Sequence, residues 1–219
     1  MSHGPRVEKS EADDFPRGFL FHLLKGRKCV KMKGINSGAI VRENSQSAMD
    51  RGVDNMRETI AIEETKNTFR GELIVDQEGL ETFAENLGTL GENGDIVCLT
   101  GDLGAGKTTF TKAFARGMGI QEHITSPTFT IIQEYEGTIP LYHFDVYRID
   151  DPLELEEIGY EEYFFGKGIT IIEWADMIKD LIPEESFWIE IRRESPTTRR
   201  VIIRGQRILH ENWLKELKA

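Results

Sequence analysis

Apolar positions along this chain are unpatterned before residue 68 and become periodic after it. Residues 1–67 follow neither a helical nor a strand period, and the stretch up to Asn55 is rich in Ser, Asn, Gly and Asp. Such a segment buries too little apolar surface to offset the entropy lost on ordering. We therefore predict that residues 1–67 are an extension to the folded domain. Either this extension is disordered, or its first 55 residues belong to a reading frame that was assigned too early a start and translation begins at Met56. A basic docking tail is the functional alternative, and residues 68–219 form the folded domain.

Strand and helix patterns alternate through that domain. Short apolar runs bounded by turn residues predict strands at residues 72–75, 95–100, 129–135, 139–145, 168–173, 187–191 and 200–204. Apolar residues at helical spacing predict helices over residues 80–90, 110–118 and 209–217, with shorter ones after residue 151 and before residue 182. Asp76 is placed to cap the first of these helices, and Gly91 to end it.

The segment between the second predicted strand and the second predicted helix carries the most specific motif. Residues 101–108 match G-x-x-x-x-G-K-[ST], in the strand–loop–helix context that this phosphate-binding loop, the P-loop, requires. Its glycines let backbone N–H groups turn inward, and the helix N-terminus adds partial positive charge. Lys107 would then reach the terminal phosphates, and the Thr108 hydroxyl would ligate Mg²⁺. A glycine-rich turn that binds nothing is the alternative, which the context disfavours.

Two carboxylates stand where such a loop needs them. Asp145 and Glu173 each follow a predicted buried strand, at the sheet edge where open α/β sheets bind ligands. One acid would serve the metal and one the attacking water. Surface carboxylates at strand ends are the alternative. The Asn/Thr-Lys-x-Asp tetrapeptide that reads guanine does not occur in the chain, which favours ATP.

The same pattern predicts the fold class. Continuous apolar runs of strand length, such as residues 95–100 and 168–173, are typical of parallel strands buried on both faces. Strands that alternate with helices around a P-loop predict a three-layer α/β fold of the P-loop NTPase type, with a mainly parallel centre and antiparallel edge strands.

The charge and the cysteine content of the chain limit its possible binding partners and its cellular compartment. Of the net charge of -11, residues 1–70 hold 13 Lys and Arg against 10 Asp and Glu, so the remainder is strongly acidic. An acidic domain is a poor stand-alone binder of nucleic acid, so any RNA is expected to be held by another protein. The two cysteines and five histidines have no zinc-site spacing, and apolar runs are too short for a membrane span. We expect a cytoplasmic protein without a membrane partner.

Taken in order, four segments resemble one family closely. Residues 101–110, the Ser-Pro-Thr-Phe at 126–129, the His-Phe-Asp-Val-Tyr-Arg at 143–148 and the Glu-Trp at 173–174 are similar to the bacterial TsaE (YjeE) P-loop ATPases of tRNA threonylcarbamoyladenosine biosynthesis. The resemblance covers roughly residues 71–205. The extension has no counterpart in the family's compact members.

The resemblance implies roles for individual residues. It implies that Asp145 is needed for hydrolysis, that Trp174 lies near the nucleotide, and that residues 126–129 form a loop responding to nucleotide state. Core packing is an equal alternative for Trp174 and Phe129, and a structural ion pair is favoured for Arg148. The expected cofactors are ATP and Mg²⁺. The expected site is Lys107, Asp145 and Glu173 as catalytic residues, Gly104, Ala105, Gly106, Lys107, Thr108, Thr109 and Trp174 for the nucleotide, and Thr108 and Glu173 for the metal.

At the level of function, the resemblance implies an ATP-hydrolysing accessory protein that acts with a TsaD–TsaB complex and is slow alone, because the motifs place no arginine finger. A small-molecule kinase is one alternative, with a lid drawn from the late arginines, although solvated strand-edge charges are the favoured interpretation of these. A nucleotide-gated interaction module, in which occupancy is the signal, is another. The late arginines are Arg192, Arg193, Arg199, Arg200 and Arg204.

Overall fold

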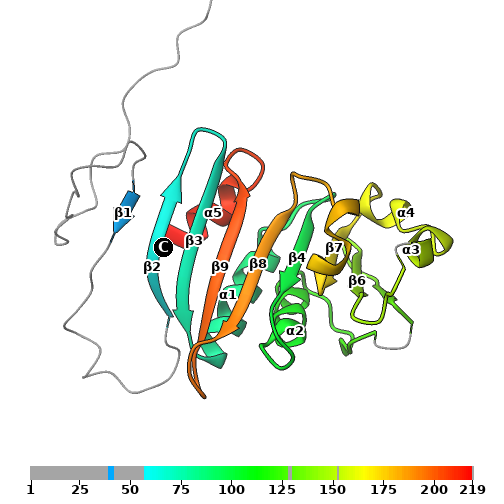
Figure 1. Cartoon of the computed structure of the whole chain (residues 1–219), viewed down its shortest axis with the longest axis horizontal. Coiled ribbons are helices and arrows are strands. Elements are labelled where there is room, and N and C mark those ends of the chain that lie inside the picture. Colours follow the sequence, from blue (N-terminus) through cyan, green and yellow to red (C-terminus); the bar gives the residue numbers. More distant parts are fainter. Residues whose placement is uncertain (1–38, 42–56, 128–129, 152, 219) are drawn as a thin grey trace, which may run out of the picture.

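A computed structural model describes residues 39–41, 57–127, 130–151 and 153–218. Within them the strands form one mixed sheet in the order β1-β2-β3-β9-β8-β4-β7-β6-β5 (Figure 1). The strands are β1 (Ala39–Val41), β2 (Arg57–Glu64), β3 (Thr68–Val75), β4 (Ile96–Thr100), β5 (Ile132–Tyr135), β6 (Leu141–Asp145), β7 (Ile169–Glu173), β8 (Phe187–Arg193) and β9 (Arg199–Gln206). The helices are α1 (Gln77–Thr89), α2 (Lys107–Gly117), α3 (Leu153–Glu157), α4 (Glu161–Phe164), the 3₁₀ helix η1 (Ala175–Leu181) and α5 (Glu211–Lys218).

The centre of the sheet is parallel. β4 pairs in parallel with β7 on one side and β8 on the other, and β6 continues the parallel block beyond β7. Antiparallel strands flank it, with β9, β3, β2 and β1 beyond β8 and β5 beyond β6. The predicted α/β class with a parallel centre and antiparallel edges is therefore confirmed. Of the two late strands, only β9 is antiparallel to its inner neighbour, because β8 still runs with β4.

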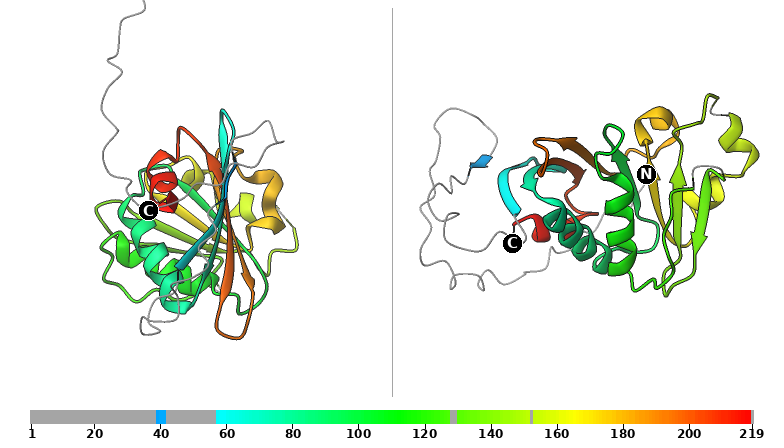
Figure 2. Two further views of the ribbon diagram at one scale, coloured as in Figure 1. Left: turned by 90° about the vertical axis from the view of Figure 1, so that its left-hand side faces the viewer. Right: turned by 90° about the horizontal axis from the view of Figure 1, so that it is seen from below.

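Helices cover both faces of the parallel block (Figures 1 and 2). Val97 and Leu99 of β4 enter a core shared with α1, α2 and α5, whereas Ile96 and Cys98 enter a second core with α3, α4 and η1. The faces alternate because successive residues of a strand point to opposite sides. The predicted three layers are thus present where the sheet is parallel.

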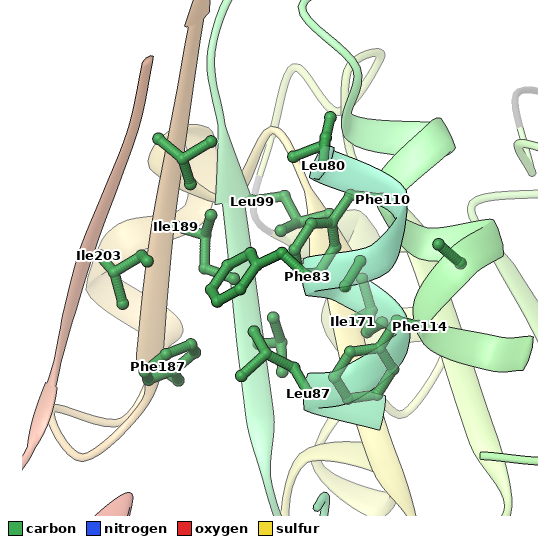
Figure 3. Close-up of a cluster of buried hydrophobic side chains, with 14 of the residues drawn as sticks. Leu80, Phe83, Leu87, Leu99, Phe110, Phe114, Ile171, Phe187, Ile189 and Ile203 are labelled. Atoms are coloured by element: carbon green, nitrogen blue, oxygen red, sulfur yellow. The ribbon is translucent and has the colours of Figure 1, made fainter. Parts of the chain in front are cut away.

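The first core fixes the helix that follows the P-loop. Phe83 of α1 meets Phe110 of α2 edge to face, and Figure 3 places both against Leu99 of β4. Gly88 lets the two helices approach closely, because a Cβ there would lie 2.1 Å from the Phe114 carbonyl oxygen. Asp76 caps α1 as expected, with a carboxylate oxygen that accepts the Gly79 N–H at 2.7 Å. This tight packing holds α2 in a fixed position relative to β4.

The predicted boundary between residues 67 and 68 does not hold in the structure. β2 lies before it and pairs with β3, so residues 57–64 belong to the sheet and residues 65–67 form the turn between the two strands. The sequence concealed this strand because the register shifts between Thr59 and Ala61, which interrupts the alternation of apolar and polar positions. The predictions for residues 1–38 and 42–56 fall outside the described residues and stay predictions.

β2 is also tied to the other end of the domain. The Arg57 guanidinium donates to the Glu216 carboxylate at 2.7 Å and to the Glu216 backbone carbonyl at 2.6 Å. It also lies over the Phe83 ring, 5.1 Å from the ring centroid. These contacts lock the first long strand onto α5. In the described part of the chain, no helix is both long and apolar enough to cross a bilayer.

Acid should weaken the fold through His210, which precedes α5. Its ring stacks on Trp213 with centroids 5.3 Å apart, its Nδ1 accepts the Gln206 N–H, and burial lowers its pKa to about 4. The unfolded chain therefore binds the proton more readily, and stability is lost as the pH falls from about 6.5 toward 4. We expect this group to lower the free energy of unfolding by about 1–2 kcal/mol between pH 7 and pH 5.

Denaturant unfolding of the wild type and of His210→Asn at both pH values measures this contribution. The stability difference between the two proteins should shrink at pH 5, because the variant lacks the titrating ring. An equal difference at both pH values would rule out His210 as the source.

Candidate functional site

The P-loop is shaped by three glycines that take positive φ angles. Gly101, Gly104 and Gly106 have φ values of 132°, 73° and 121°. At Gly101 only glycine fits, because a Cβ would lie 2.1 Å from the Ile191 carbonyl oxygen of β8. The loop therefore turns tightly at the carboxyl end of β4 and leads directly into α2. No side chain caps that helix, so its first-turn N–H groups remain for an anionic ligand.

Lys107 lies folded back onto the loop that precedes it. Its side chain donates to the Gly101 carbonyl at 2.6 Å and to the Asp102 carbonyl at 3.0 Å, and the residue is only 5% exposed. Its Nζ also lies 3.4 Å from the centroid of the Trp174 ring. Burial lowers the pKa of Lys107, while nearby carboxylates, Glu173 first among them, oppose that shift. The acids thus help to keep a confined ammonium group charged.

Glu173 ends β7 and is 2% exposed. Its Oε2 accepts the hydroxyl of Thr108 at 2.8 Å, and its Oε1 accepts that of Thr111 at 3.2 Å. His143 of β6 places its Nε2 2.9 Å from the same Oε1. One carboxylate therefore joins β7, β6 and α2, and the structure brings Thr108 and Glu173 together as the sequence predicted.

Asp145 ends β6, directly beside Glu173 in the parallel register. Its Oδ2 accepts the Ser126 hydroxyl at 2.5 Å, and its Oδ1 accepts the Tyr147 N–H at 3.2 Å. The backbone N–H of Asp145 donates to the carbonyl of Ile131, a β-branched residue in the left-handed region with φ 63°. The acid is thereby fastened to a strained segment next to the predicted responsive loop. Phe129 itself lies outside the described residues.

Trp174 follows Glu173 in a left-handed conformation, with φ 65°. That turn directs the indole over Lys107 and against Tyr147, whose ring centroid is 4.7 Å away. The ring also packs on the second core, as the core-packing alternative expects, and its place near the nucleotide stays a prediction. Left-handed geometry is costly for such a residue and is kept where surrounding contacts enforce it.

The remaining predicted residues lie in or beside the loop. Gly104 forms its exposed apex, and Gly106 ends it. Ala105 is buried, and its carbonyl accepts the Nε of Arg199 at 2.9 Å, so a residue from β9 holds the P-loop backbone. Thr109 lies half-buried in the first turn of α2, and Arg148 is exposed after β6.

Sequence reasoning missed three contributors to this arrangement. Thr111 lies one helical turn after Lys107 on the buried side of α2, and His143 is a fully buried polar residue within an apolar strand. Both signals are visible in the sequence as polar residues at core-facing positions. Arg199 carries no such signal, because only the pairing of β9 with β8 brings it near the P-loop.

The late arginines do not gather over the P-loop. Arg199 reaches it from beside the sheet, while others form ion pairs on the open face of the antiparallel strands: Arg192 and Arg204 with Glu190, and Arg200 with Glu72 and Glu194. Charges so interleaved are solvated strand charges, as the sequence favoured. The kinase alternative loses the lid on which it depended.

Oxygen donors at this edge suit a hard cation that also binds phosphate. Mg²⁺ in nucleotide sites is held by one or two protein groups together with phosphates and waters. The hydroxyl of Thr108 and the carboxylates of Glu173 and Asp145 supply that chemistry beside the P-loop. Among the described residues, no group of three or more His, Cys, Asp or Glu side chains forms a metal site by itself. The oxygen donors of Thr108, Glu173 and Asp145 are of the type that Mg²⁺ binds.

Comparison with known families gives a match over residues 74–202, to the model described as threonylcarbamoyl adenosine biosynthesis protein TsaE. The chain belongs to the TsaE family. A TsaE protein of Bacillus subtilis is 44% identical over 144 residues, which is 65% of this chain and 90% of the relative. One from Treponema pallidum is 45% identical over 106 residues, covering 48% and 78% of the two chains.

A solved TsaE-like structure agrees with the fold. The crystal structure of Bacillus subtilis YdiB superposes with a TM-score of 0.58 and 36% identity, covering 71% of this chain and 97% of that one. Every site residue described above lies inside the segment that the TsaE model matches. β2 and α5, which carry Arg57 and Glu216, lie outside that segment.

Loss of Arg199 should loosen the P-loop specifically. Arg199→Ala removes a charged donor from the Ala105 carbonyl, a bond that contributes about 1.5–3 kcal/mol. Arg204→Ala, on the same strand but on the open face, is the matched control. We expect amide hydrogen exchange to quicken at residues 102–107 in Arg199→Ala only. Equal protection of these amides in both variants would show that Arg199 does not support the loop.

Proposed function

We propose that this chain is a Mg²⁺-dependent ATPase that serves tRNA threonylcarbamoyladenosine biosynthesis as an accessory protein. The convergence of Lys107, Thr108 and Glu173 at one end of the parallel strands carries the proposal. Membership of the TsaE family, and the printed names of its relatives, support the assignment to tRNA modification.

ATP would bind with its phosphates in the P-loop. The uncapped N–H groups of α2 and the inward-turned loop would receive the phosphate oxygens. Lys107 would exchange its two neutral carbonyl partners for phosphate oxygens, whose negative charge attracts the ammonium group more strongly. The missing guanine-reading tetrapeptide supports adenine over guanine.

Thr108 and Glu173 would hold the Mg²⁺ ion, and Asp145 would position the attacking water. The ion, when bound, neutralises charge on the phosphates. Asp145 stands one strand away from Glu173, which suits separate tasks for the two acids. Its bond to Ser126 keeps the carboxylate oriented until a ligand competes for it.

Completion of this site would fall to a partner, which we take to be a TsaD–TsaB complex. Arginine fingers raise hydrolysis by P-loop proteins about 10³–10⁵-fold, and Arg199 is committed to the Ala105 carbonyl. The acidic domain supports indirect contact with tRNA, held by the partner. Cysteine usage supports a cytoplasmic setting, with Cys98 a free buried thiol.

A nucleotide-gated interaction module is a second candidate, favoured by one observation. Asp145 is bonded both to Ser126 and to the strained backbone at Ile131. A ligand that withdraws Asp145 from Ser126 would release that segment without any hydrolysis. Occupancy alone would then be the signal to the partner.

ATP hydrolysis by the purified chain, alone and with an added TsaD–TsaB pair, tests the first function. We expect slow turnover alone and stimulation by the pair. Lys107→Ala should reduce the stimulated rate by about a hundredfold or more, because it removes the cation from the phosphates. Hydrolysis that the pair leaves unchanged would withdraw the tRNA assignment and direct the search to metabolite phosphorylation.

Asp145→Asn distinguishes the ATPase from the gated module. Hydrolysis should fall about 10²–10⁴-fold while ATP affinity changes little, since the acid positions water and does not bind phosphate. Formation of threonylcarbamoyladenosine by the reconstituted system is measured in parallel. Its loss together with hydrolysis supports the ATPase, and its persistence without hydrolysis supports gating by occupancy.

A further inference from the structure

We propose that His143 is a positioning residue that holds the Glu173 carboxylate in place to receive the Mg²⁺ ion of a bound nucleotide. The inference rests on the proposed function and adds a residue to the site. His143 is fully buried in β6, two positions before Asp145, and so lies on the same face of that strand. Its register partner Ile171 is two positions before Glu173 on β7. The imidazole therefore lies beside the Glu173 carboxylate, on the side toward the start of the two strands.

The hydrogen bonds assign different tasks to the two carboxylate oxygens of Glu173. Oε2 accepts the hydroxyl of Thr108, the last residue of the P-loop motif. Oε1 lies deeper, between Thr111 and His143. An ion shared with Thr108 would therefore meet Oε2, while Oε1 anchors the group.

His143 is the dedicated donor to that anchor. The Thr111 hydroxyl has one hydrogen, and it lies within reach of both the Lys107 carbonyl at 3.1 Å and Glu173 Oε1 at 3.2 Å. It can serve one acceptor at a time, whereas the imidazole Nε2 faces only the carboxylate among the hydrogen bonds described. The shorter distance, 2.9 Å, also belongs to His143.

The surroundings of the ring show which of its nitrogens serves Glu173. His143 Nδ1 is buried and has no hydrogen-bond partner among the described residues. An ionised carboxylate only accepts hydrogen bonds, so Nε2 is the ring atom that carries a hydrogen and donates it to Glu173 Oε1. An apolar side chain could fill the buried position of His143 equally well. The hydrogen bond to Glu173 is therefore the reason for a histidine at this position.

Calorimetric titration of ADP, with Mg²⁺ and with a chelator, tests the proposal by binding alone. His143→Leu should reduce the gain in ADP affinity due to Mg²⁺ about tenfold while the affinity without metal stays within about threefold, a factor of ten being 1.4 kcal/mol. His143→Gln, whose amide can donate to the same oxygen, should restore most of the gain. His210→Gln changes another buried histidine and serves as the matched control.

Thr111→Val keeps the proposal testable should His143→Leu fail to fold. This change of similar shape removes the other donor to Oε1 and should lower the Mg²⁺ gain further in the His143→Gln background. An unchanged gain in His143→Leu, or equal losses with and without Mg²⁺, would overturn the positioning role. If the wild type binds no ADP under either condition, the proposed function fails instead, so the two failures are distinguishable.

Discussion

A buried carboxylate at the end of β7 is the constraint on which the rest of the site depends. At Glu173, two parallel strands and the helix after the P-loop meet through hydrogen bonds. Taking a carboxylate out of water is costly unless several donors surround it, and here three side chains do so. The P-loop is therefore held at both ends: Gly101 is pressed against β8, and Thr108 is bonded to β7.

The parts of this arrangement that depend on local chemistry could be predicted from the sequence. The glycines, Lys107 and Thr108 define the P-loop by spacing alone, and the position of Asp145 and Glu173 after buried strands placed both acids at one sheet edge. Contacts between distant segments could not be predicted in the same way. Arg199 reaches Ala105 across 94 residues, and nothing in its neighbours marks it.

β2 shows a different limit of sequence reasoning. A bulge between Thr59 and Ala61 breaks the alternation on which strand prediction depends, and the strand buries itself only partly. Its place in the sheet comes from backbone pairing with β3 and from the contacts of Arg57 with α5. A pattern of apolar residues identifies a strand when its buried positions recur at a regular spacing. An outer strand that is held in part by an ion pair lacks this regular spacing.

The Arg57 clamp has a consequence for biosynthesis. Arg57 and Glu216 are 159 residues apart, so the strand leaves the ribosome long before the helix that completes its packing. At synthesis rates of about 5–20 residues per second, β2 waits for roughly ten seconds or more with its charged anchor unmatched. The nascent domain therefore closes only when α5 emerges to cover β2, its first long strand.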